Sequence, residues 1–122
     1  VVNQDGTLGV RPDLMQLSSK LPGGAPGIAT VTAFGSFRLS AITPSVYIVG
    51  PNGADTNVTR QVLFSGVKTF GGGAAFTEHD GSIPERINGN SVTRVNMHFI
   101  GTRTASVYPN GHYEALVVLR CE

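Results

Sequence analysis

The residues able to perform acid–base or metal chemistry are three histidines, one cysteine and a short run of carboxylates. The histidines are His79, His98 and His112, and no two of them have the His-x-His or His-x3-His spacing of a metal site. We interpret them as ordinary exposed polar residues. The sequence therefore predicts no metal centre and no bound cofactor.

Three carboxylates, Glu78, Asp80 and Glu85, lie close together in the sequence, with Asn88 a few residues further on. Carboxylate and amide oxygens are ligands that Ca²⁺ accepts, but neither an EF-hand loop nor a tandem Asp repeat accompanies them. A solvated acidic loop over residues 79–90 is the preferred interpretation.

Cys121 is the only cysteine and lies one residue from the end, so it cannot form a disulfide within this chain. Three hypotheses remain open: a free thiol, a disulfide to another chain, or pairing with a cysteine outside this sequence. Its place at the end of an apolar strand also fits plain burial. A nucleophilic cysteine would need a histidine loop to meet the terminus. We therefore predict that the protein is not an enzyme.

The composition indicates one globular domain that is displayed outside the cell. The 122 residues are 40% hydrophobic and 14% charged, with a formal net charge of +1, which favours neither nucleic acid nor an anionic membrane as partner. No run approaches the roughly 20 apolar residues that cross a bilayer, and the amino terminus has neither methionine nor a leader, which indicates a processed or trimmed chain. We expect an extracellular or cell-surface location and no membrane insertion.

Alternating hydrophobicity predicts an antiparallel all-β fold. Thr93, Val95, Met97 and Phe99 share one face of a half-buried strand, while residues 113–119 are apolar on both faces, as in a central strand. Turns are indicated by five dipeptides that tolerate positive φ: Asp5-Gly6, Asn52-Gly53, Asp80-Gly81, Asn88-Gly89 and Asn110-Gly111. We predict a single immunoglobulin-like β-sandwich of about seven strands over residues 1–122.

The amino-terminal quarter has a different pattern. Residues 11–20 are expected to contain one helical turn, and residues 21–27 form a loop rich in proline and glycine. In residues 1–10, Val2, Leu8 and Val10 share one parity, which fits either an ordinary edge strand or a strand donated to a neighbour.

The carboxy-terminal third resembles a known family. Asn88-Gly89, the alternating Val95, Met97 and Phe99, and Gly111-x-Tyr113 before an apolar strand resemble donor-strand-exchange pilus subunits of the spore coat protein U, or archaic chaperone-usher, type. The match lies mainly in residues 88–122. The resemblance implies a sandwich lacking one strand, whose open groove is filled by a strand from a neighbouring subunit.

On this resemblance the chain is expected to be a structural subunit of an extracellular fibre that polymerises by strand donation. Its partners would be copies of itself, with a periplasmic chaperone and an outer-membrane usher, and Cys121 could form an intermolecular disulfide. The candidate donor residues are Val2, Leu8 and Val10. The candidate residues of the acceptor groove are Phe37, Leu39, Ala115, Val117 and Leu119.

Two other functions remain open. One is a self-contained secreted module that binds protein or carbohydrate through the loops around Asn52, Asp80 and Asn110. The absence of tryptophan argues against sugar binding, and tyrosines could serve only if exposed, with Tyr108 the best candidate among Tyr47, Tyr108 and Tyr113. The other is a viral or phage coat or decoration protein, which shares this composition.

Overall fold

The computed structural model describes residues 1–71 and 75–122, and every regular element among them is a β-strand. The strands are β1 (Val2–Gln4), β2 (Gly9–Val10), β3 (Gln16–Ser18), β4 (Gly27–Ala33), β5 (Phe37–Ile42), β6 (Val58–Gly71), β7 (Phe76–Asp80), β8 (Glu85–Ile87), β9 (Ser91–Arg103) and β10 (Val118–Cys121). The predicted all-β antiparallel fold class is confirmed. Ten strands are described instead of about seven, because four of them contain only two or three residues.

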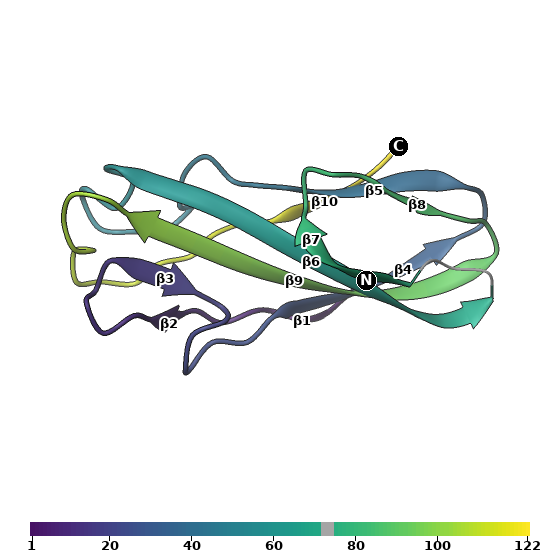
Figure 1. Cartoon of the computed structure of the whole chain (residues 1–122), viewed down its shortest axis with the longest axis horizontal. Helices are drawn as coiled ribbons and strands as arrows, with labels where there is room; N and C mark the ends of the chain where they lie inside the picture. The colour runs from purple at the N-terminus through teal and green to yellow at the C-terminus, as the bar shows by residue number, and fades with distance from the viewer. Residues whose placement is uncertain (72–74) are drawn as a thin grey trace.

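The strands form two sheets that pack as layers. In the larger sheet β9 is central: β6 follows one of its edges, and its other edge is shared by β4 and β3. β1 extends this sheet beyond β4, β2 beyond β3, and β7 beyond β6. The smaller sheet has the order β10-β5-β8. Figure 1 shows β5, β8 and β10 in one layer and β1, β4 and β9 in the other.

The core lies between the layers and is built from alternate residues of facing strands. Leu39, Val62, Phe64, Ile87 and Val95 are completely buried there. The strand predicted at residues 93–99 is confirmed as part of β9. Burial of these side chains is the main favourable contribution to folding.

The predictions for residues 113–119 and for residues 11–20 are wrong. Residues 113–119 are not a central strand, because only Val118 onwards is regular and β10 lies at an edge of its sheet. Their second apolar face is solvent-accessible, with Leu116 54% exposed. The expected helical turn in residues 11–20 is absent, since residues 16–18 pair with both β2 and β9.

Most of the predicted loop at residues 21–27 is irregular, with Gly27 opening β4. Residues 79–90 are not one acidic loop, because they hold the end of β7 and all of β8. Nothing in the described part of the chain is a helix that could cross a bilayer.

Candidate functional site

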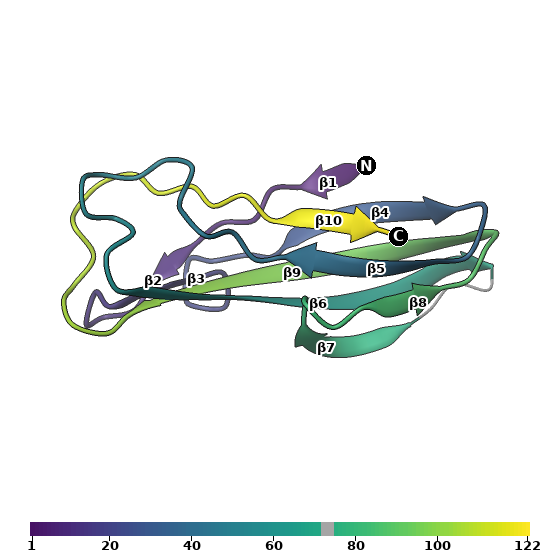
Figure 2. The ribbon, with the colours of Figure 1, turned by 90° about the horizontal axis from the view of Figure 1, so that it is seen from above.

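One long edge of the sandwich is open. Figure 2 shows β1 and β10 at the same edge of the molecule, and Figure 1 shows that they belong to different layers. Each is the last strand of its sheet on that side, and the two do not pair with each other. Two strand edges with unpaired backbone groups therefore run along this side, and such edges are ready templates for another strand.

A groove of about 720 Å³ lies on this side of the molecule, between β1 with the segment that follows it and the irregular segment that precedes β10. One wall comes from residues 2–10 and the other from residues 111–117. Its floor is contributed largely by apolar residues of β3 and β9, Leu17, Met97 and Phe99, with Gly27 at the start of β4. An apolar floor between two polar backbone edges suits an extended peptide whose alternate side chains point inward.

The candidate donor residues form one wall of this groove in their own molecule. Val2 pairs with Ala29 of β4, and Val10 pairs with Leu17 of β3. Val2, Leu8 and Val10 all line the groove. Residues 1–10 thus provide edge strands here.

The candidate acceptor residues divide into two groups. Ala115 and Val117 line the wall opposite Val2, Leu8 and Val10. Phe37, Leu39 and Leu119 do not line the groove but pack in or against the core between the sheets. The sequence alone does not indicate the floor, although it predicts correctly that Met97 and Phe99 share one apolar strand face.

Both β10 and the segment before it have backbone hydrogen-bonding groups without partners in the described structure. Arg38 and Glu122 exchange both of their backbone hydrogen bonds, and the antiparallel register continues to Val118 opposite Ile42. Because such pairing alternates along a strand, Leu119 and Cys121 turn their N–H and C=O groups away from β5. Ala115 and Val117 lie in the irregular segment before β10 and have no backbone hydrogen bond to any other described residue.

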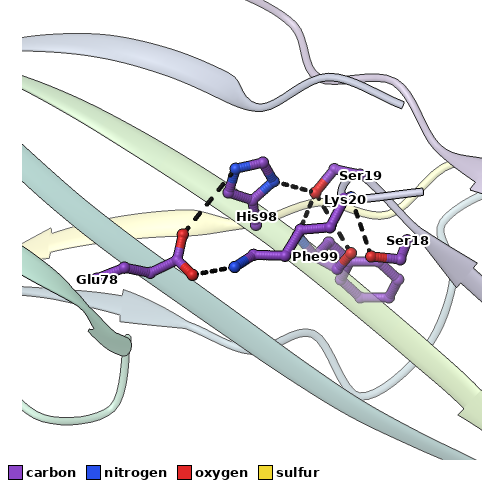
Figure 3. A network of polar contacts seen from close by, with 6 residues as sticks. All are labelled: Ser18, Ser19, Lys20, Glu78, His98 and Phe99. Atoms are coloured by element: carbon purple, nitrogen blue, oxygen red, sulfur yellow. Dashed lines mark hydrogen bonds and ion pairs between the residues drawn. The ribbon is translucent and has the colours of Figure 1, made fainter. Parts of the chain in front are cut away.

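The floor is braced by a chain of polar contacts (Figure 3). Ser19 Oγ lies 2.8 Å from Nδ1 of His98 and accepts a hydrogen bond from the N–H of Phe99. On the far side of the ring, Nε2 of His98 is 4.0 Å from a Glu78 carboxylate oxygen, and Glu78 also pairs with Lys20. Burial lowers the pKa of His98, and this effect exceeds the opposing influence of Glu78.

Tyr47 and Tyr108 are too buried to be sugar-binding platforms. Tyr47 and Tyr108 are each only 6% exposed, and their hydroxyls are hydrogen-bonded to each other over 2.6 Å. Tyr113 packs edge-on against both rings and donates its hydroxyl hydrogen to Pro109 O. Desolvation raises the pKa of all three phenols. The choice of Tyr108 as an exposed ligand platform is therefore wrong.

The histidines, the cysteine and the carboxylates do not come together in a catalytic or metal site within the described part of the chain. His98 is only 18% exposed along its side chain, contrary to expectation, and His79 pairs with Glu85 over 2.7 Å. Within residues 1–71 and 75–122 no three histidine, cysteine, aspartate or glutamate side chains are grouped so as to hold a metal ion. Cys121 is exposed, so plain burial is the wrong interpretation of its position.

No protein-family model matches this chain, and neither a curated protein nor a solved structure matches it.

Proposed function

We propose that the chain is the structural subunit of an extracellular fibre, and that its groove receives an extended strand from a neighbouring subunit. The observation that carries this proposal is an apolar-floored groove with the free edge of β1 on one side and the unpaired backbone of Ala115 and Val117 on the other. In this interpretation the molecule is an immunoglobulin-like sandwich that lacks the strand between β1 and β10.

Filling the groove would lower the free energy in two ways. The inserted strand would supply backbone partners to the edge that includes Ala115 and Val117. Its inward side chains would cover the floor, at roughly 25 cal/mol per Å² of apolar area removed from water. Because donor and acceptor are different surfaces, the contact is heterologous and repeats into an open fibre.

Residues 1–10 belong to the acceptor wall in this proposal. The amino group of Val1 bonds Thr30 O, and the backbones of Thr7 and Ala25 exchange two hydrogen bonds. Donating this segment would break these contacts and remove one wall of the donor molecule's own groove. We therefore assign the inserted strand to a different segment of the assembly. A periplasmic chaperone and an outer-membrane usher remain proposed partners on the resemblance to pilus subunits.

A matched pair of glycine variants tests the proposal. A Cβ at Gly27 meets only ordinary contacts, the nearest at 3.7 Å, so Gly27→Leu should fold while placing a branched side chain in the groove lining. Gly35 faces open space away from the groove, so Gly35→Leu is the control.

Electron microscopy and solution mass of native material, with circular dichroism to check folding, provide the measurement. Wild type and Gly35→Leu should form fibres, and folded Gly27→Leu should remain monomeric. A wild-type protein that stays monomeric, or a Gly27→Leu variant that polymerises normally, would contradict the proposal.

A further inference from the structure

The charged side chains that line the groove are negative when histidine is counted as neutral. They include two carboxylates, Asp5 on the amino-terminal wall and Glu114 on the opposite wall, and no lysine or arginine. Both carboxylate residues are exposed. With histidine counted as neutral, the lining has two negative charges, although the whole chain has a formal net charge of +1.

Several of the chain's own cations are engaged elsewhere. Arg11 pairs with Asp13, Lys20 with Glu78, and Arg120 with Glu122. Among the described residues, His112 is the ionisable neighbour at the rim, and its Nε2 lies 3.4 Å from a Glu114 oxygen. In the part of the chain that the structure describes, therefore, no lysine or arginine neutralises Asp5 and Glu114, the two carboxylates at the rim of the groove.

The geometry of the walls defines the length and pattern of a suitable occupant. The wall at residues 111–117 contains seven positions, and an extended strand of seven residues spans about 23 Å at about 3.3 Å per residue. In a strand of that length, alternate side chains point to opposite sides. Inward positions would meet the apolar floor, and outward positions would lie near the rim.

We infer that the groove selects an extended polypeptide segment with apolar side chains at every second position and at least one lysine or arginine between them. This inference rests on the proposed function and names the chemistry of the inserted strand. The apolar floor and the free backbone edges favour a segment with apolar side chains at alternate positions. The carboxylates of Asp5 and Glu114 favour a lysine or arginine between those positions.

The chain's own residues 1–10 do not meet this description. Their one charged side chain is Asp5, and they contain no lysine or arginine. Inserted into a neighbour's groove, this segment would bring a third carboxylate to the rim. The charge pattern agrees with its assignment to the wall.

The test uses the whole chain and three synthetic peptides that share the same alternating apolar residues. Their intervening positions carry lysine, glutamine or glutamate. Two exposed ion pairs should make the lysine peptide bind about tenfold more tightly than the glutamate peptide at low salt, with the difference shrinking at high salt. The double variant Asp5→Asn with Glu114→Gln should lose the preference, whereas Asp13→Asn, outside the groove, should retain it.

Calorimetry would give the affinities, and amide shifts at Ala115 and Val117 would locate the bound peptide. Equal binding of the three peptides in the groove would overturn the charge inference and leave the strand-accepting groove intact. Absence of binding by every peptide would overturn both. A salt-sensitive preference for lysine that needs Asp5 and Glu114 would support the inference.

Discussion

The hydroxyl oxygen of Ser19 accepts a hydrogen bond from the backbone N–H of Phe99 over 3.0 Å, and the Ser19 N–H donates to the Phe99 carbonyl. This contact lies where β9 changes partner. β3 ends at Ser18 opposite Ile100, and β4 begins at Gly27 opposite Met97. One serine therefore provides the hydrogen-bond partners that neither strand reaches, at the floor of the groove.

Ser19→Ala should lower the free energy of unfolding by about 1–2 kcal/mol, because the buried N–H of Phe99 loses its acceptor. Urea denaturation measures the change. Ser36→Ala is the control, since Ser36 is exposed in the turn between β4 and β5, and its stability should change by less than about 0.5 kcal/mol. Equal stability of the two variants would show that Ser19 does not brace the floor.

Stability should decrease on mild acidification through His98. Burial holds the pKa of His98 below its ordinary value of 6.5, with Lys20 acting in the same direction and Glu78 against it. The folded chain therefore binds this proton less readily than the unfolded chain. The associated stability is present above pH 6.5 and is lost as the pH falls through the folded-state pKa.

Urea denaturation above and below pH 6.5 tests this dependence. His98→Asn, whose amide oxygen can replace Nδ1 as a partner of Ser19, is the comparison that removes the titration. The wild type should lose more stability than the variant between the two conditions. Parallel losses would assign the pH dependence to the carboxylates instead.

Thr93→Val should stabilise the protein. Thr93 is 0% exposed, and its hydroxyl oxygen has no hydrogen-bond partner among the described residues. Valine has a similar shape and removes this unpaired polar atom, so the free energy of unfolding should rise by on the order of 1 kcal/mol. Thermal or urea denaturation measures it, and a destabilised variant would indicate that the hydroxyl has a partner in solution.

Alkaline pH should unfold the protein as its tyrosines ionise. Burial raises the pKa of Tyr47 and Tyr108 above 10.0, so their stabilising contribution is present below pH 10.0 and is lost as the pH rises further. Tyrosinate absorbance and circular dichroism should change together. Ionisation of all three tyrosines near pH 10.0 with the fold intact would contradict the buried cluster.

The sequence was informative where a local pattern decides the structure. The alternation from Thr93 to Phe99 predicted a strand and its buried face correctly, because a strand's side-chain period is a local property. Of the glycine dipeptides, Asn52-Gly53 lies in a turn with positive φ at Gly53 as expected, whereas Asp5-Gly6 does not lie in a turn, and none of them indicated which strands pair. Asn88-Gly89, for example, connects β8 of the smaller sheet to β9 of the larger one.

The position of the groove could not be predicted from any single segment of the sequence. Leu39 and Val117 lie on apolar faces of their segments, yet Leu39 is buried in the core and Val117 lines the groove. The difference depends on which strand edge lacks a neighbour, and that is a property of the sheet order. In residues 11–20, pairing with β2 and β9 overrides a weak helical preference.

Hydrogen exchange at the second wall of the groove tests the central claim most directly. In the isolated chain the amides of Ala115 and Val117 should exchange quickly, because no described backbone group pairs with them, whereas Glu114 donates to Val49 and provides the protected reference. In assembled fibres both amides should become protected as the inserted strand supplies their partners. Fibres in which Ala115 and Val117 still exchange as fast as in the monomer would contradict strand insertion into this groove.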